Sequence, residues 1–494
     1  MMNPVSLIIV PALTALFILA IRNSGHAKWI ALGGAVVQMG LSAILCYRYL
    51  HLPADSKGVM AFQQSWPFFP TLNISFHFGV DGISLAMILL TSLVVAAGIL
   101  VSWNVDRMKK EFFFLLTLLA AGAYGFFISL DLFVLFFFLE VAVIPKYLLI
   151  AIWGSGKKEY SANKLALMLM GASALVLVGM LGLYYGSSGD AHSFDLVRLG
   201  EQSMSAERQR LFFPFLFLGF GVFTALFPFH TWVPDGHSSA PTAGSMFLAG
   251  ISMKLGGYGC LRVAVWLMPD AAREYSPYII ILSAIAILYG AFATMMQKDL
   301  KYMNAYSSIS HCGFVLLGTG MLTHTAINGA VVQMVSHGLM TALFFAVIGM
   351  VYARTHTRVI GEMSGLMRSL PFIMTVFFLS GLCSLGLPGL SGFVAEMTVF
   401  MGSWEHPDLF HRAATVTACL SIVVTAVYIL RATGQVAMGP ASDAAASFSD
   451  ASWNEKAASV LLLGGIFAIG LMPSWLNALI EPSITVMSTR LGIR

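Results

Sequence analysis

Charged side chains are scarce in this sequence. Asp, Glu, Lys and Arg together make up 10% of the 494 residues, whereas hydrophobic residues make up 58%. Ordinary soluble domains carry about 25% charged residues, which cover their surface against water. The composition therefore excludes a soluble globular protein.

Motifs that hold cofactors are also missing. The five cysteines stand singly and form no C-x-x-C pair, so the sequence gives no iron–sulfur or zinc site. It contains neither a glycine-rich phosphate loop nor a dinucleotide fingerprint. The net charge of +4 is too small to indicate nucleic acid binding. We expect no cofactor, no metal, no catalytic redox site and no nucleic acid partner for this chain.

Long apolar runs, by contrast, recur from one end of the chain to the other. Each is long enough to cross a hydrocarbon core of about 30 Å, and backbone at that depth must satisfy its own hydrogen bonds by forming helices. The first run lacks the basic flank and the small-residue site of a cleaved signal. We predict an all-α integral membrane protein, surrounded by lipid, with about fourteen transmembrane helices. The expected spans are 5–21, 29–49, 79–102, 112–130, 132–153, 164–186, 211–230, 241–266, 277–296, 303–322, 326–352, 371–401, 412–431 and 456–478.

Lys and Arg in the connections predict the orientation. Loops 1–2, 3–4 and 5–6 are rich in both, whereas loops 2–3 and 4–5 hold only Arg48 and Lys57. The positive-inside rule then places the N-terminus on the outer side, and an even number of spans places the C-terminus there too. Loop 11–12 agrees and loop 6–7 does not. The longest connections are 50–78, 187–210 and 432–455, and the last, rich in Ala, Ser and Asp, is expected to be flexible.

Two stretches that contain proline, the second of them with glycine as well, interrupt predicted spans. They are 226–234 in span 7 and 384–392 in span 12. Such residues kink or unwind helices, and breaks at equivalent places in two halves indicate an inverted-repeat transporter. Unrelated proline kinks are the alternative. The repeat interpretation divides the chain into N-terminal helices 1–3 (1–110), a first repeat of helices 4–8 (111–268), a second repeat of helices 9–13 (269–431) and a C-terminal loop with helix 14 (432–494).

Four charged residues stand out inside predicted spans, at Glu140, Lys146, Lys254 and Glu396. A charge near the bilayer centre costs about 2.5–3.5 kcal/mol, so each is a functional candidate. Two alternatives remain: Glu140 and Lys254 could form one structural ion pair, and Lys146 could extend toward an interface. Asp81 and Asp131 stand at span ends, where we expect helix caps or interfacial residues.

Three histidines accompany these charges, at His230, His311 and His337. Histidine can take up and release protons near neutral pH, and a series of Glu, Lys and His across a bundle is what a proton relay needs. A histidine that only joins two helices by a hydrogen bond is the alternative.

Several motifs resemble those of the proton-translocating NADH dehydrogenase membrane subunits. The segment 229–245, which contains Ala-Pro-Thr-Ala-Gly-Ser, is similar to the M-type subunit (chain 4), and the resemblance extends over nearly the whole chain. Further matching motifs are 78–85, 248–259, 306–314 and 386–396.

The resemblance implies fourteen helices with two inverted five-helix repeats and a charged axis along the middle of the membrane. Matched by position, Glu140 is the span 5 glutamate, Lys254 the central span 8 lysine and Glu396 the ionisable residue of broken span 12. The linking histidines would be His230, His311 and His337.

The resemblance also implies a function and partners. The chain would be a non-redox, proton-translocating subunit of a complex I-type NADH-quinone oxidoreductase in a bacterial inner (plasma) membrane. Its partners would be L-type and N-type antiporter-like subunits, small membrane subunits and a peripheral arm, which would hold NADH (or ferredoxin), flavin, iron–sulfur clusters and quinone. Alternatives are a subunit of a membrane-bound hydrogenase or of a multisubunit cation/proton antiporter, or a structural membrane spacer.

One position departs from the family pattern. The family has a lysine in span 7, seven residues before the motif histidine, and here that position is Phe223. Lys146 lies six residues after Glu140, an offset that does not share a helix face unless Pro145 bends the helix. Our hypothesis is that Lys146 supplies the missing positive charge. The rival is that the first half-channel is altered or lost.

Overall fold

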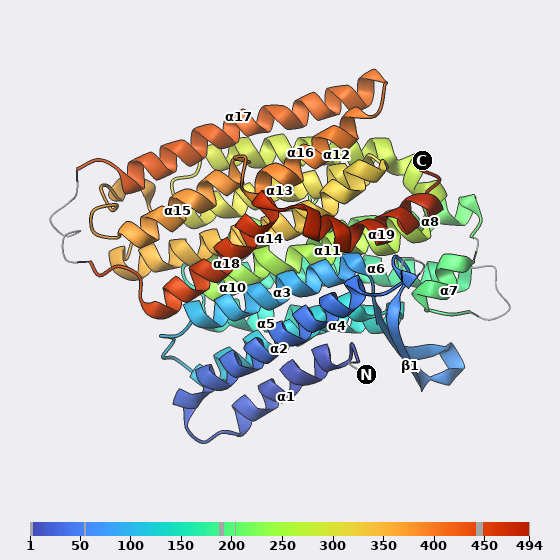
Figure 1. Ribbon diagram of the computed structural model, residues 1–494, viewed down its shortest axis with the longest axis horizontal. Helices are drawn as coiled ribbons and strands as arrows, with labels where there is room; N and C mark the ends of the chain where they lie inside the picture. The colour runs from blue at the N-terminus through green and yellow to red at the C-terminus, as the bar shows by residue number, and fades with distance from the viewer. Residues whose placement is uncertain (1–2, 54–55, 187–191, 203, 441–447, 494) are drawn as a thin grey trace.

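The helices of this protein run side by side in one elongated bundle, and their connections gather at its two ends (Figure 1). The computed structural model describes residues 3–53, 56–186, 192–202, 204–440 and 448–493. Both termini lie at the same end of the bundle, which fits an even number of crossings (Figure 1).

Nine helices in the described part of the chain are long and apolar enough to cross a membrane. They confirm a mostly helical membrane protein. These helices are α2 (Ala27–Leu50), α3 (Gly82–Val101), α4 (Lys109–Ile128), α5 (Leu132–Trp153), α6 (Lys158–Gly186), α12 (Pro269–Met295), α14 (His324–Thr355), α17 (Leu409–Ala437) and α18 (Trp453–Leu471). Helices α1 (Ser6–Ala20) and α13 (Leu300–Gly320) lie in the same bundle.

Both predicted breaks are present as gaps between paired helices. The first separates α8 (Ala206–Phe223) from α9 (Trp232–Ser239), and the second separates α15 (Pro371–Ser384) from α16 (Ser391–Trp404). Each gap contains a proline, which has no N–H to donate and therefore cannot continue the hydrogen-bonded ladder.

A third break lies near the C-terminus, where the sequence predicted one span at 456–478. The helix stops with α18 and resumes as α19 (Ser474–Arg490) after Pro473, so the prediction of an unbroken span was wrong. The two helices together follow the whole of α3. Asn454 of α18 donates to the Leu100 carbonyl near one end of α3 (2.8 Å), and Ser483 of α19 accepts from Gly82 at the other (2.9 Å).

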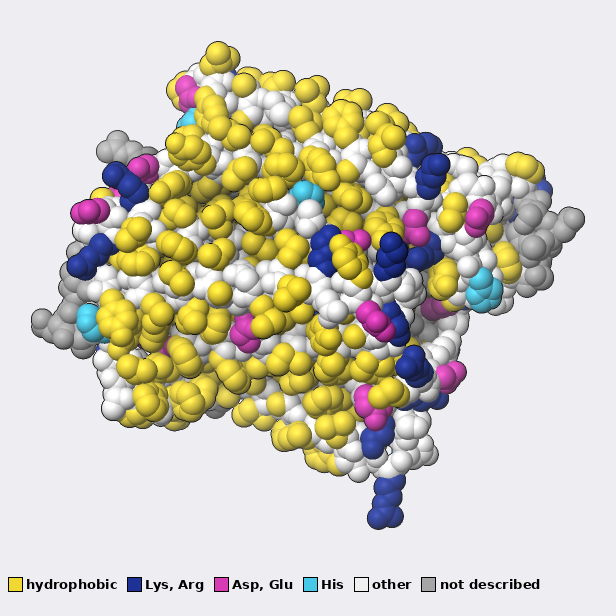
Figure 2. All heavy atoms as spheres, turned by 180° about the vertical axis from the view of Figure 1, so that it is seen from behind, with side chains coloured by type: hydrophobic (Ala, Val, Ile, Leu, Met, Phe, Trp, Pro, Cys, Tyr) yellow, Lys and Arg dark blue, Asp and Glu magenta, His cyan; other side chains and the backbone are white. Residues whose placement is uncertain are grey.

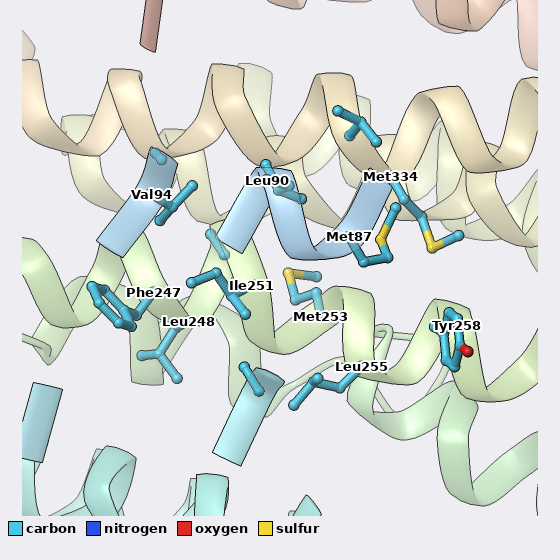
Figure 3. Close-up of a cluster of buried hydrophobic side chains, with 14 of the residues drawn as sticks. Met87, Leu90, Val94, Phe247, Leu248, Ile251, Met253, Leu255, Tyr258 and Met334 are labelled. Carbon is cyan, nitrogen blue, oxygen red and sulfur yellow. The ribbon is translucent and has the colours of Figure 1, made fainter. Parts of the chain in front are cut away.

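The segment expected as span 8 is helical throughout but contains two π-helical stretches. It consists of α10 (Thr242–Phe247), the π-helix η4 (Leu248–Ser252), α11 (Met253–Gly259) and the π-helix η5 (Cys260–Val265). Apolar side chains of α3 and α14 pack around it (Figure 3). Wide π turns are rare and frequently mark functional sites.

The connection expected at 50–78 contains two strands that the sequence did not predict. Strands β1 (Ala61–Phe69) and β2 (Ile74–Val80) form an antiparallel hairpin at the end of the bundle that holds both termini. Residues 79–80, expected in span 3, belong to β2. The short helix α7 (Leu196–Glu201) lies in the connection expected at 187–210, and α17 extends past the expected end of span 13. Residues 441–447 of the loop expected to be flexible lie outside the described residues.

The surface agrees with this architecture. Hydrophobic side chains cover most of the face shown in Figure 2, and the Lys and Arg side chains seen there are few, lying mostly in the right half of the view and at its left edge. This distribution fits a bundle whose middle lies in hydrocarbon.

Candidate functional site

Four buried ionisable side chains from four helices form a continuous chain inside the bundle. Nζ of Lys254 on α11 lies 2.9 Å from Nδ1 of His337 on α14. The ring of His337 stacks on that of His311 on α13, with centroids 5.4 Å apart. Nδ1 of His311 lies 3.3 Å from Oε1 of Glu396 on α16. All four side chains are at most 5% exposed, so the structure brings together four of the seven predicted site residues.

The π turn before Lys254 helps to hold its ammonium group. The Met253 N–H bonds the Leu248 carbonyl, five residues back, and the next carbonyl, Ala249, accepts from Lys254 Nζ at 2.6 Å. Because an ammonium group only donates, Nδ1 of His337 must accept from it. In neutral His337 the proton then sits on Nε2, a buried atom with no hydrogen-bond partner among the described residues.

The second helix break makes room for Glu396. Gly386 in this break has φ +76°, a conformation that glycine adopts without strain. A Cβ at this position would lie 2.8 Å from Oε2 of Glu396. Ser384, at the end of α15, lies 3.0 Å from Nε2 of His311. Gly386 therefore leaves space for the Glu396 carboxylate, and Ser384, just before the break, contacts the imidazole that faces it.

Glu140 and Lys146 lie in the first half of the chain, on α5. Glu140 is partly buried and accepts from the Ser173 hydroxyl of α6. The side chain of Lys146 is 1% exposed, so the alternative that it extends toward an interface is wrong. Its Nζ has no hydrogen-bond partner among the described residues and lies 5.9 Å from the centre of the Phe223 ring.

The alternative of a structural ion pair between Glu140 and Lys254 is also wrong. Lys254 bonds a carbonyl and His337, and within the described part of the chain no ion pair within 4.0 Å involves Glu140. Lys254 instead contacts a residue of the other half of the bundle.

His230 lies apart from the four-residue chain, in the break between α8 and α9. Its ring packs against those of Tyr289 (4.8 Å between centroids) and Phe227 (5.5 Å), and Nδ1 is buried with no partner among the described residues. The structure therefore does not join it to the other predicted histidines.

One fully buried histidine in the described part of the chain was missed. His237 on α9 is fully buried, and neither ring nitrogen has a partner in the described part of the structure. Its ring packs against Trp232 and Phe345. The residue stands inside the matching motif 229–245, which was the available signal. Because its neighbours in the sequence are polar, it did not stand out as an ionisable residue in an apolar run.

A polar cavity of about 580 Å³ lies at the C-terminal end of α9, where Ser238 and Ser239 line it. Arg358 also lines it and donates to the Ser238 carbonyl at 2.9 Å. Lys301 is buried and donates to the Ala240 carbonyl at 2.6 Å. Polar groups thus continue from the cavity along α9 to His237.

The expected caps are confirmed at the opposite end of the bundle. Asp81 caps α3 through the Ser84 N–H, and Asp131 caps α5. Asp81 also forms a buried ion pair with Arg262 of η5. Near them, burial acts to raise the pKa of Asp195, but the hydrogen bonds with His77 (2.5 Å) and the Arg198 N–H, together with the positive charges of both residues, hold that pKa below its usual value.

Membrane helices, two broken spans and a buried Lys–His–His–Glu chain define an antiporter-like membrane subunit. The family described as NADH:quinone oxidoreductase/Mrp antiporter, TM, matches residues 129–421. The chain belongs to this family, as an antiporter-like subunit M of the complex I type.

Relatives support this placement along almost the whole chain. NAD(P)H-quinone oxidoreductase chain 4 1 of Synechococcus sp. (strain JA-3-3Ab) is 37% identical over 474 residues, covering 95% of this chain and 89% of the relative. NAD(P)H-quinone oxidoreductase chain 4 2 of Microcystis aeruginosa is 38% identical over 443 residues, covering 88% and 79%.

Solved structures share the fold. A chain of respiratory complex I from Thermus thermophilus with bound NADH superposes with a TM-score of 0.90 at 25% identity, covering 99% of this chain and 100% of that one. A chain of the Mrp complex from Dietzia sp. DQ12-45-1b gives 0.85 at 18% identity, covering 99% of each, which speaks for the fold alone.

Proposed function

We propose that this chain translocates protons as the M-type membrane subunit of a complex I-type NADH-quinone oxidoreductase. The observation that carries the proposal is the buried chain from Lys254 through His337 and His311 to Glu396. Ionisable side chains are costly at membrane depth, and four in succession mark an ion pathway.

The geometry suggests the order of proton transfers. Lys254 gives a proton from Nζ to Nδ1 of His337, and His337 releases the proton on Nε2. His311 accepts it and passes the proton on Nδ1 to Oε1 of Glu396. The two imidazole rings are stacked rather than hydrogen-bonded, so the middle transfer requires a water molecule or a ring rotation.

The driving free energy must come from elsewhere in the complex. Moving one charge across the membrane costs about 2.3 kcal/mol per 100 mV. We assign electron transfer from NADH or ferredoxin through flavin and iron–sulfur clusters to quinone to the partner subunits. A charge shift reaching Glu140 would act on Lys146 and then on Lys254. The four buried residues from Lys254 to Glu396 would then take up and release protons in step with quinone reduction.

We assign Lys146 the role of the lysine that Phe223 replaces. The Lys146 ammonium group, although it belongs to α5, sits against the ring at that position of α8. A positive charge carried by α5 therefore lies close to the position on α8 at which the family has its lysine.

We propose fourteen spans, with α8/α9, α10–η5, α15/α16 and α18/α19 each counting as one. Two equivalent helix starts support inverted repeats over spans 4–8 and 9–13. Asp131 caps α5 through the Phe133 and Val134 N–H groups, and Asp299 caps α13 through the corresponding pair at 301 and 302.

The backbone around these two caps repeats as well. Each aspartate forms an isolated antiparallel bridge with the connection two helices further on, Asp131 with Asp195 and Asp299 with Val359. Five spans separate the two caps, which puts them at opposite ends of the bundle, as an inverted repeat requires. On this topology and the positive-inside rule, both termini lie on the outer side of a bacterial inner membrane.

The test uses Lys254→Ala in membrane vesicles that contain the assembled complex. We expect quinone reduction to continue while proton uptake per electron falls, because the proton pathway loses the lysine that donates to His337. Lys298→Ala, an exposed lysine in the α12–α13 connection, is the control. Normal proton uptake with normal quinone reduction in Lys254→Ala would refute the relay, and uptake of ²²Na⁺ in place of protons would favour the cation antiporter alternative.

A further inference from the structure

Two histidines and an aspartate converge at the turn between α16 and α17. His406, Asp408 and His411 each offer a metal-ligating atom, and these three atoms lie within 4.8 Å of one another. We propose that this turn binds a divalent transition metal of the Zn²⁺ class. The proposal does not depend on the proton pathway.

The hydrogen bonds of His406 are those of a metal ligand with an orienting partner. Its Nε2 lies 2.7 Å from the Met321 carbonyl in the α13–α14 turn, so Nδ1 is the ring nitrogen that remains to bind a metal. Metal-bound histidines usually donate their other ring N–H to a carbonyl or carboxylate, which fixes the ring and its tautomer.

Asp408 and His411 are already paired. Oδ2 of Asp408 lies 2.7 Å from Nδ1 of His411, and a metal would replace the proton that these two atoms share. Oδ1 of Asp408 accepts from the His411 backbone N–H at 3.1 Å as the cap of α17, which holds the carboxylate in place.

The donor set and its exposure suit zinc. Imidazole and carboxylate are zinc ligands with bonds of about 2.0–2.2 Å, and three protein ligands leave a fourth position for water. The Asp408 side chain is 48% exposed, so solvent can reach that position. The guanidinium group of nearby Arg412 stacks on Trp404, 5.2 Å from the ring centre, and thus engages an aromatic ring of α16.

Binding requires a small rearrangement. The two imidazole rings now stack with centroids 4.0 Å apart, so at least one must rotate to aim a lone pair at the ion. Tetrahedral ligands with bonds of about 2.1 Å lie about 3.4 Å apart, which side-chain rotation in a partly exposed turn can reach.

The position of the turn gives the site a consequence. Met321 follows α13, which carries His311, and α16 carries Glu396. Thr323 also donates to the Gly402 carbonyl at 2.9 Å, so the two turns are already joined. A bound ion would fasten the outer ends of these two helices more firmly to each other.

The test is equilibrium dialysis of the purified complex against buffered ⁶⁵Zn²⁺. The parent should bind one more zinc ion per complex than the double variant His406→Ala/His411→Ala, and Asp408→Asn should weaken that binding at least about tenfold. Asparagine caps helices as well as aspartate does, so Asp408→Asn keeps α17 intact. His51→Ala, an exposed histidine after α2, should bind zinc like the parent.

Equal zinc content and affinity in the parent, the double variant and Asp408→Asn would overturn the proposal. If the double variant does not assemble, His406→Gln takes its place, because glutamine can still donate to the Met321 carbonyl but is a poor zinc ligand. A full complement of zinc at unchanged affinity in that variant would likewise overturn it.

Discussion

The ammonium group of Lys146 lies 5.9 Å from the centre of the Phe223 ring, between α5 and α8. An aromatic face attracts a cation, and the attraction grows when both groups are removed from water. No hydrogen-bond partner for this ammonium group is present among the described residues. A buried cation that faces the position of a missing lysine is an arrangement expected of compensation between two helices.

The first prediction exchanges these two residues. Lys146→Met should lower proton uptake per electron by about tenfold or more, because the first half of the pathway loses its cation. The double variant Phe223→Lys/Lys146→Met should restore most of the uptake by returning the charge to α8. The measurement is NADH-driven proton uptake in vesicles, normalised to quinone reduction. Unchanged uptake in Lys146→Met would mean that the first half-channel works without this lysine or is lost.

The second prediction separates the two roles of His337. In His337→Gln the side-chain oxygen can still accept from Lys254, so the buried ammonium group keeps its partner, but an amide does not relay protons at neutral pH. We expect normal assembly and quinone reduction with strongly reduced proton uptake. His356→Gln, in the α14–α15 connection, should behave like the parent. If His337→Gln pumps normally, His337 is a structural partner of Lys254 and nothing more.

The sequence predicted the residues of the buried chain better than their contacts. Glu396, Lys254 and the histidines were found because charge is rare and costly in apolar spans. Their pairing was not predictable, since Lys254 and His337 are 83 positions apart and meet only through helix packing. For the same reason, the sequence alone could not exclude the alternative of an ion pair between Glu140 and Lys254.

The errors in the fold have local causes. The break at Pro473 was missed because the run on both sides is apolar, and hydropathy does not register a lost hydrogen bond. The β-hairpin was missed because β1 carries Pro67 in a polar connection that gave a weak strand pattern. The break in span 7 was predicted correctly from its prolines, and the break in span 12 from proline and glycine together.

The third prediction concerns the space that Gly386 leaves for Glu396. Gly386→Ala puts a methyl group against the carboxylate and forces alanine into a left-handed conformation, at a cost of about 1–2 kcal/mol. We expect displacement of Glu396 from His311 and a loss of proton uptake close to that of Glu396→Gln. Gly434→Ala, where a methyl group meets nothing within 4 Å, is the control. Uptake in Gly386→Ala that matches the control would show that the position of this carboxylate is unimportant.

The last prediction concerns stability at the other end of the bundle, where Arg262 and Asp81 form a buried ion pair that is at most 4% exposed. Removing one partner of a buried pair leaves an uncompensated charge and typically costs about 3–5 kcal/mol, whereas an apolar replacement of the whole pair is often nearly neutral. Asp81→Asn keeps the cap of α3 but strands the guanidinium group, so we expect a clearly lower thermal unfolding midpoint of the purified complex. Asp81→Asn/Arg262→Met should recover most of that loss, because the unpaired charge is gone and the methionine fills the volume. If both variants unfold at the same reduced temperature, the cost comes from lost packing or capping and the ion pair contributes little.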